Sequence, residues 1–159
     1  MKVRIAGIIP DSLTNGPGIR MVIFSQGCKH HCKECHNPHT WDLGKGYEIE
    51  IDELEQIIKR NKLISGVTLS GGDPFEQEYS FYVLCRRLKR LGLNIWCYTG
   101  YTFEKIKDSK LLGAIDVLVD GKFEKDNTLN AKKFTGSTNQ RIIDVVESIK
   151  SGKVIEIGC

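Results

Sequence analysis

GCKHHCKECHNPHTW, residues 27–41, is the stretch that decides how the rest of the chain is arranged. It contains all four histidines of the chain and three of its six cysteines, at Cys28, Cys32 and Cys35. Because it follows the apolar run Met21 to Phe24, it predicts a loop that leaves the end of a strand and surrounds a metal centre. A structural zinc site is normally closed by four side chains. Three cysteines therefore favour an iron-sulfur cluster with one iron left open to bind a molecule from solution.

The length and composition indicate a globular chain. A domain of 159 residues buries about two-thirds of the surface that its unfolded chain exposes. The 40% hydrophobic and 27% charged residues are ordinary proportions for such a domain. The net charge of +3 is small, and Lys and Arg are scattered along the chain. We therefore expect one domain over residues 1–159 and no nucleic-acid partner.

The cellular setting follows from the apolar runs. The N-terminus carries no apolar secretory segment, and no run approaches the roughly 20 residues that cross a bilayer. We expect a cytoplasmic protein with no membrane contact. Thiols stay reduced in that compartment, so the cysteines are free to bind metal instead of forming disulfides.

Strands and helices alternate along the predicted chain. Apolar runs predict strands at 19–25, 67–69, 94–98 and 115–119. Helical spacing of apolar residues predicts a helix at 51–62 and a short one at 102–107. Between them it predicts a helix that ends at Gly92 and carries on one face Phe81, Leu84, Leu88 and Leu91. Strand, loop and helix in repetition indicate a parallel sheet with right-handed crossovers.

The length limits how far this sheet can close. A closed barrel of eight such units needs about 250 residues, and this chain has 159. We therefore expect an α/β fold, an open partial (β/α) barrel with a mostly parallel sheet. Outside the repeat we expect an edge strand or strap over 1–10 that Pro10 ends, irregular chain from 122 to 140, and a last edge strand over 154–157.

The unusual residues of the chain follow the predicted strands. The cysteine loop, SGGDP at 70–74, TGY at 99–101 and DGK at 120–122 each come directly after a strand. In parallel α/β sheets, binding and catalysis occur at the carboxyl ends of the strands. These four segments therefore mark the predicted functional edge.

Several motifs resemble known families. Cys28-x3-Cys32-x2-Cys35 after one strand, with Gly71-Gly72-Asp73-Pro74 after the next, resembles the radical S-adenosylmethionine enzymes. NGPGIR at 15–20 and CHNPHTWD at 35–42 are similar to the activases of glycyl radical enzymes. Within that group, the chain resembles the activating proteins of the anaerobic ribonucleoside-triphosphate reductase, through WCYTGY at 96–101, VLVDGKF at 117–123 and GSTNQR at 136–141. The resemblance spans about residues 11–145.

The resemblance implies a cofactor, a cosubstrate and two protein partners. Cys28, Cys32 and Cys35 would bind three irons of a 4Fe-4S cluster, and the fourth iron would bind S-adenosyl-L-methionine. Reductive cleavage of this cosubstrate would produce a glycyl radical on the large subunit of the anaerobic ribonucleoside-triphosphate reductase. A flavodoxin- or ferredoxin-like protein would donate the electron.

The resemblance also implies contacts with the cosubstrate. Many superfamily members have an aromatic residue before the third cysteine, where this chain has Glu34, and His36 is a candidate substitute for the adenine platform. Gly71 and Gly72 would let the backbone approach the methionine end, and a hydrogen bond would join its ammonium to Asp73. The expected contacts are Glu34, Cys35, His36, Gly71, Gly72, Asp73 and Thr99, although Thr99 equally suits a plain turn.

Alternatives remain at several positions. If the protein is a zinc-stabilised binding module, a histidine of the same loop is the fourth ligand. If it is an activase with a different target, that target is another glycyl radical enzyme, of the pyruvate formate-lyase type, or a small molecule. Asp120 and Lys122 suit either a ligand site or a surface ion pair. Among the remaining residues, we expect Cys85 and Cys97 in the core and Trp41 over the cysteine loop, and we assign no role to Cys159.

Overall fold

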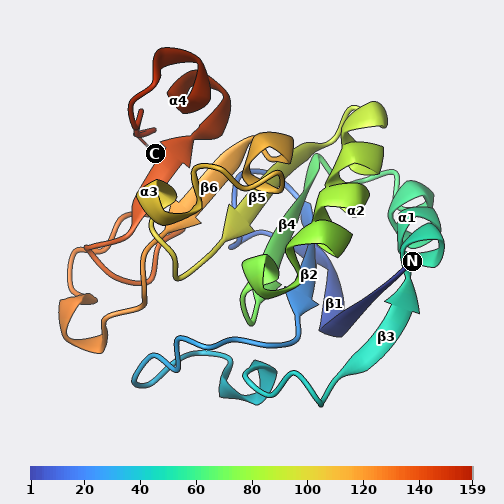
Figure 1. Ribbon diagram of the computed structural model, residues 1–159, viewed down its shortest axis with the longest axis horizontal. Helices are drawn as coiled ribbons and strands as arrows, with labels where there is room; N and C mark the ends of the chain where they lie inside the picture. Colours follow the sequence, from blue (N-terminus) through green and yellow to red (C-terminus); the bar gives the residue numbers. More distant parts are fainter. Residues whose placement is uncertain (159) are drawn as a thin grey trace.

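The computed structural model describes residues 1–158 as one seven-stranded sheet with its main helices on one face (Figure 1). The strand order is β3-β1-β2-β4-β5-β6-β7. The strands are β1 (Lys2–Ser12), β2 (Arg20–Ser25), β3 (Tyr47–Glu50), β4 (Gly66–Gly71), β5 (Asn94–Tyr98), β6 (Val117–Asp120) and β7 (Arg141–Asp144). The α-helices are α1 (Ile51–Arg60), α2 (Glu78–Arg90), α3 (Phe103–Ile106) and α4 (Val145–Ser151). Short 3-10 helices lie at η1 (Pro38–Thr40), η2 (Pro74–Gln77), η3 (Leu112–Ala114) and η4 (Lys125–Asn127).

The sheet is parallel at its centre and antiparallel at both margins. β2, β4, β5 and β6 pair in parallel, whereas β1, β3 and β7 join antiparallel, so three of the six pairings are parallel. The expectation of a mostly parallel sheet is therefore only partly correct. The connection from β1 to β2, residues 13–19, is too short for the dozen or more residues that a parallel crossover needs.

The N-terminal strand differs most from the prediction. β1 lies between β3 and β2, so it is not an edge strand, and Pro10 lies inside it instead of ending it. The pairing of β1 with β2 shifts register between Ile9 and Ser12. Proline has no N–H to donate to the hydrogen-bond ladder. A bulge of this kind leaves a residue unpaired, so it accommodates the proline.

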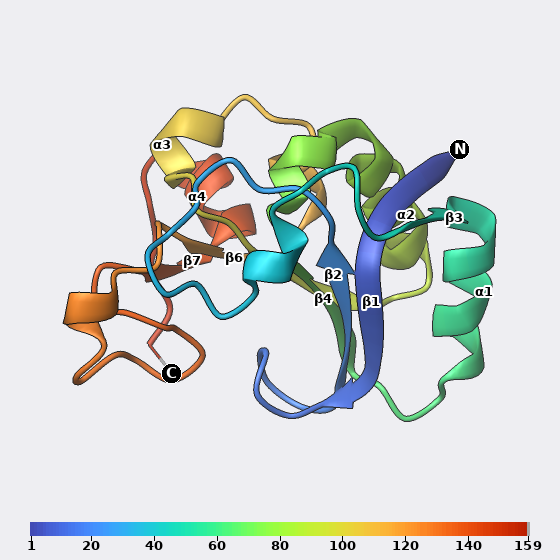
Figure 2. The same ribbon diagram turned by 90° about the horizontal axis from the view of Figure 1, so that it is seen from below.

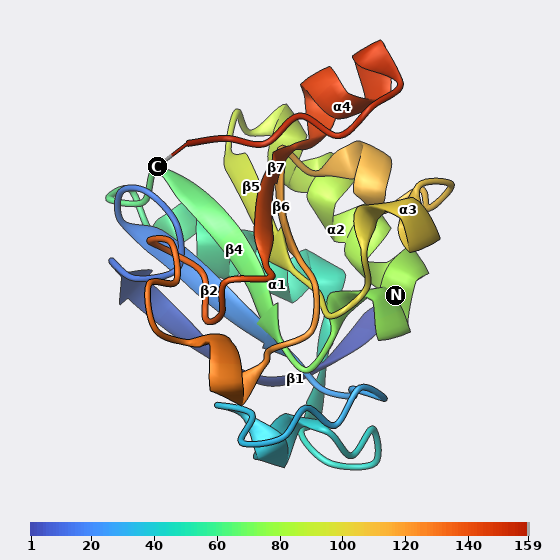
Figure 3. The same ribbon diagram turned by 90° about the vertical axis from the view of Figure 1, so that its left-hand side faces the viewer.

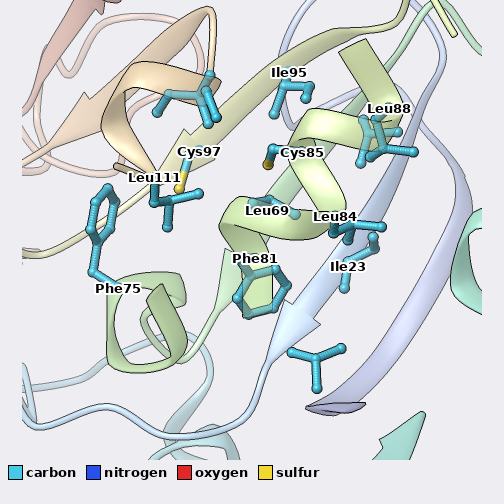
Figure 4. Packing of buried hydrophobic residues seen from close by; sticks show 14 of the residues in the cluster. Ile23, Leu69, Phe75, Phe81, Leu84, Cys85, Leu88, Ile95, Cys97 and Leu111 are labelled. Carbon is cyan, nitrogen blue, oxygen red and sulfur yellow. The ribbon is translucent and has the colours of Figure 1, made fainter. Parts of the chain in front are cut away.

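The hydrophobic core lies between the sheet and its helices. On α1, the side chains of Ile51, Leu54 and Ile58 are buried at helical spacing. Figure 4 shows Phe81, Leu84 and Cys85 of α2 close to Leu69 of β4 and Cys97 of β5. Both cysteines are fully buried, which confirms their predicted place in the core.

The opposite face of the sheet is covered by loops. On β5, Ile95 and Cys97 belong to the core under the helices, while Trp96 alternates to the other face. There Trp96 packs with Phe134 of the long segment 121–140, which crosses this face (Figure 3). The main helices and this segment therefore leave the carboxyl ends of the central strands free to form a site.

Arg20 of the NGPGIR motif lies at the amino ends of the central strands. Its side chain is almost completely buried. Nε donates to the hydroxyl of Thr68 at 2.8 Å, and Nη2 donates to the carbonyl oxygens of Val67 and Asn94, each at 3.0 Å. Burial lowers the pKa of Arg20 to about 10. This motif joins β2, β4 and β5 at the edge remote from the cysteines.

Other boundaries differ locally from the prediction. The sequence pattern missed β3 and α4, and placed a strand at 154–157 where the structure has a single bridge from Glu156 to Ile143. α2 ends at Arg90, and Leu91 is exposed instead of joining the buried face. Across residues 1–158, every helix is too short or too polar to span a bilayer.

The core predicts a large effect for one substitution. Leu84→Ala removes a side chain with 0% exposure, so the free energy of unfolding of the apo-protein should fall by about 3 kcal/mol. Urea unfolding followed by circular dichroism measures this change. The matched control is Leu63→Ala, whose side chain is 79% exposed and should cost less than about 0.5 kcal/mol. Equal losses in the two variants would contradict the assignment of the core.

Candidate functional site

A cavity of about 340 Å³ lies at the carboxyl ends of the central strands. The strand β2 leads into the cysteine loop, which passes along this edge in Figure 2, and β4 leads into the Gly-Gly-Asp-Pro turn. The cavity brings together most of the residues that the sequence singled out: Cys28, Cys35, His36, Gly71, Gly72, Asp73 and Thr99. Cys32 and Glu34 are not in its wall.

Backbone hydrogen bonds close the cysteine loop at its base. The N–H of Gly27 donates to the carbonyl of Thr40 at 2.6 Å, and the N–H of Cys28 donates to the carbonyl of Trp41 at 3.1 Å. The buried side chain of Gln26 donates to the carbonyl of Asp42 at 2.7 Å. The Trp41 ring packs over the loop as expected, stacked on His31 with their centroids 4.5 Å apart.

The thiols of the loop are free and partly buried. Burial raises the pKa of the Cys28 thiol, while hydrogen bonds from the backbone amides of His30 and His31 lower it. Burial also raises the pKa of Cys32, and the backbone amide of Phe123 opposes this shift. Amide donors aimed at sulfur stabilise a thiolate, which is the form that binds metal.

The Gly-Gly-Asp-Pro turn packs directly on the start of the cysteine loop. The N–H of Gly72 donates to the carbonyl of Ser25 at 3.0 Å. Gly71 has φ +114°, and a Cβ there would lie 2.4 Å from the backbone nitrogen of Ser25. A Cβ on Gly72 would lie 2.5 Å from the carbonyl oxygen of Gly27. Both positions need glycine for this close approach of two main chains, whatever ligand the turn also holds.

Asp73 is buried, with 1% of its side chain exposed. Its Oδ1 accepts from the N–H of Phe75 at 3.0 Å, and its Oδ2 accepts from the N–H of Gly100 at 2.9 Å. The hydroxyl of Thr99 contacts both oxygens, at 2.9 and 2.8 Å, and His30 Nε2 contacts Oδ2 at 2.7 Å. The contact with His30, on the cysteine loop, is one that the sequence did not indicate.

Glu34 and His36, on either side of Cys35, have different surroundings. The side chain of Glu34 is 70% exposed and forms an ion pair with Lys125 at 3.6 Å, so the structure does not bring it to the cavity. The ring of His36 lines the cavity and lies against Phe123, with their centroids 4.8 Å apart. Phe123 directly follows the DGK segment, and an aromatic residue at a strand end is the signal that could have identified it.

Asp120 pairs with Arg141 and not, as a surface pair, with Lys122. It is buried at the end of β6, and Oδ2 accepts from Nη2 of Arg141 at 2.6 Å and from the N–H of Phe103 at 2.8 Å. Asp120 meets Arg141 because the antiparallel pairing of β6 with β7 places the two residues opposite each other. Further along, Gln140 donates to the carbonyl of Gly121 at 3.0 Å. The segments DGKF and GSTNQR therefore form one wall together.

The set of donors fits an iron-sulfur cluster better than a zinc ion. In the chain as far as Gly158, no three His, Cys, Asp or Glu side chains are grouped to hold a single metal ion. A tetrahedral zinc site needs four such ligands around one point, so the zinc alternative gains no support. Thiolates of a 4Fe-4S cluster each bind a different iron and need not converge. Cys159 lies outside the described residues.

Comparisons with known proteins show to which family this chain is similar. The family described as "4Fe-4S single cluster domain" matches residues 14–143. The chain is similar to proteins named anaerobic ribonucleoside-triphosphate reductase-activating protein from three sources. Identity is 38% with that of Enterobacteria phage T4, over 85% of this chain and 90% of the relative, and 39% with that of Vibrio cholerae, over 84% and 92%. Identity with the Escherichia coli protein is 34%, over 82% and 92%.

The fold is similar to a solved structure. The crystal structure of QueE from Escherichia coli superposes with a TM-score of 0.54 at 21% sequence identity. The match covers 64% of this chain and 54% of the QueE chain, so this chain spans about half of that protein. At this identity the likeness concerns the fold alone.

The burial of the thiols predicts which cysteines react in the apo-protein. Iodoacetamide at pH 8 should modify Cys28, Cys32 and Cys35 much faster than Cys85 and Cys97, because burial raises the pKa of the last two and also blocks access. Peptide mass spectrometry after short exposure measures each site. In urea the five rates should become similar. Rapid modification of Cys97 in the folded protein would contradict the site geometry.

Proposed function

We propose, since this chain belongs to the family of the anaerobic ribonucleoside-triphosphate reductase-activating proteins, that it activates that reductase by generating a glycyl radical on its large subunit. One observation supports this most directly. The loop of three free cysteines and the Gly-Gly-Asp-Pro turn, which come from neighbouring parallel strands, share one cavity.

Cys28, Cys32 and Cys35 would hold the 4Fe-4S cluster. When bound, the cluster supplies the electron that cleaves S-adenosyl-L-methionine, and this chemistry removes a hydrogen atom from the reductase glycine. The loop itself supplies the sulfur ligands; burial raises the pKa of Cys28 and Cys32, and backbone amides beside them oppose this rise. The stacked ring of Trp41 would limit access of solvent to the outer side of the loop.

The other cavity residues would place the cosubstrate. Gly71, Gly72 and Asp73 form the turn that would face its methionine end. At the adenosine end, His36 lies against the ring of Phe123, and both line the cavity, so these two rings would form the adenine platform. Cys35 completes the contacts that we assign, and Thr99 would act through its hydrogen bonds to Asp73.

The wider organisation completes the proposal. Residues 1–159 would form a single domain, and the open sheet would be a partial barrel of the radical S-adenosylmethionine type. Its open side would be closed by the reductase, which would exclude other hydrogen donors from the radical. A flavodoxin- or ferredoxin-like protein of the cytoplasm would supply the electron.

The activity itself is tested by electron paramagnetic resonance. Anaerobically reconstituted protein should contain about four irons per chain. With reductant and S-adenosyl-L-methionine it should produce a glycyl doublet on the reductase. Cys32→Ala should lose iron, cosubstrate cleavage and the doublet together, whereas the control Cys85→Ala, in the core, should retain all three. A doublet on another glycyl radical enzyme and none on the reductase would refute the target.

The two residues that flank Cys35 predict a contrast in cosubstrate binding. His36→Ala removes a ring that lines the cavity, so the KM for S-adenosyl-L-methionine should rise by about fivefold, as expected for the loss of one stacking partner of about 1 kcal/mol. Glu34→Ala, which changes an exposed side chain, should leave KM within about twofold. Cosubstrate cleavage at varied concentration measures both. A larger effect at Glu34 than at His36 would contradict the assigned platform.

A further inference from the structure

A buried hydrogen-bond network joins the three loops that leave β2, β4 and β5. We propose that His30 is a positioning residue: through the carboxylate of Asp73 it fixes the loop of Cys28 against the Gly-Gly-Asp-Pro turn and against the loop of Thr99. The inference rests on the proposed function, because it assigns to His30 a task toward the cluster and its cosubstrate.

The carboxylate of Asp73 is saturated by donors from these loops. Two carboxylate oxygens offer about four lone-pair sites. Four hydrogens point to them, from the N–H of Phe75, the N–H of Gly100, the hydroxyl of Thr99 and Nε2 of His30. An ionised carboxylate only accepts, so Nε2 of His30 carries the hydrogen. Because a buried charge is stable only when it is fully bonded, each donor holds its loop in place.

His30 connects this carboxylate to the first cysteine. Its ring is 7% exposed and bonds Asp73, and His30 lies two residues after Cys28 in the same loop. Movement of the ring would therefore also move the backbone beside Cys28. The ring of His30 has little room to move. A Cβ on Gly100 would lie 2.5 Å from Cδ2 of His30, and the ring of Tyr101 packs edge-on against the His30 ring, with their centroids 4.4 Å apart.

A second link runs beside the first between the same loops. The hydroxyl of Tyr101 donates to Oε1 of Glu76 at 2.5 Å, and Lys29, next to His30, pairs with Oε2 of Glu76 at 3.4 Å. Lys29 is 83% exposed, so this contact is weak. The buried contact between His30 and Asp73 is therefore the stronger restraint on the loop.

The four donors give Asp73 a role beside the contact expected with the ammonium of the cosubstrate. A cosubstrate that bonds this carboxylate would meet a group that three loops already hold in place. The carboxylate therefore also acts on the reaction through the loops that it joins. On this view His30 and Thr99 matter for cosubstrate binding without touching the metal.

The experiment compares His30→Leu, which removes the donor, with His30→Gln, whose amide nitrogen can replace Nε2. Nitrogen-15 NMR of the wild-type apo-protein should show a slowly exchanging imidazole N–H that is absent from His30→Gln. After reconstitution, His30→Leu should retain about four irons per chain. Its affinity for S-adenosyl-L-methionine should fall by about tenfold or more, with loss of the cosubstrate-induced change in the electron paramagnetic resonance spectrum. His30→Gln should restore both properties to within about threefold of the wild type.

A second pair of variants tests the network away from the cysteine loop. Thr99→Val removes a donor to Asp73 and should weaken cosubstrate binding as His30→Leu does, whereas Thr99→Ser should not. Wild-type affinity and spectra in both His30→Leu and Thr99→Val would overturn the proposal. Loss of iron from His30→Leu, or no restoration in His30→Gln, would also overturn it, since His30 would then hold the metal or the fold. A wild-type protein that binds no cluster would instead refute the proposed function, while the NMR signal would still report on the network.

Discussion

The in-register parallel pairing of β2 with β4 is the constraint on which the site depends. Ser25 lies opposite Gly71, so the cysteine loop and the Gly-Gly-Asp-Pro turn begin side by side at the same edge. The two main chains approach so closely that a Cβ on Gly71 or Gly72 would overlap the other backbone. Only residues without side chains allow the contact. The same glycines that we propose face the cosubstrate are therefore needed to assemble the walls of the cavity.

Buried polar groups specify how these loops sit. Asp73 draws donors from three loops, and Asp120 binds Arg141 and the backbone of Phe103. Each carboxylate would be costly to bury without its partners, so the loops are stable only in the arrangement that satisfies them. At the opposite edge, Arg20 performs the corresponding task with neutral acceptors, and its lowered pKa reflects the cost of burial. Polar contacts therefore order both ends of the strands, while apolar packing holds the layers together.

The late segments that carried the resemblance to the family also contact one another. Gln140 and Arg141 of GSTNQR bind Gly121 and Asp120 of VLVDGKF, and Phe123 lies between this wall and the cysteine loop. Motifs that are far apart in the chain thus build one side of a single cavity. These late motifs shape the face of the site that the cysteines and the glycine turn leave open.

The sequence by itself determined the features that short-range patterns encode. Cysteine spacing predicted the metal loop, and apolar periodicity located β5 at its observed bounds and α1 to within two residues, because both signals lie within one short window. Tertiary structure alone decided the rest. Pro10 stays in β1 because a bulge accepts it, β3 forms because β1 offers an edge, and His30 meets Asp73 across 43 residues because strand register places them together. Local pattern cannot encode such pairings, since they depend on which strands become neighbours.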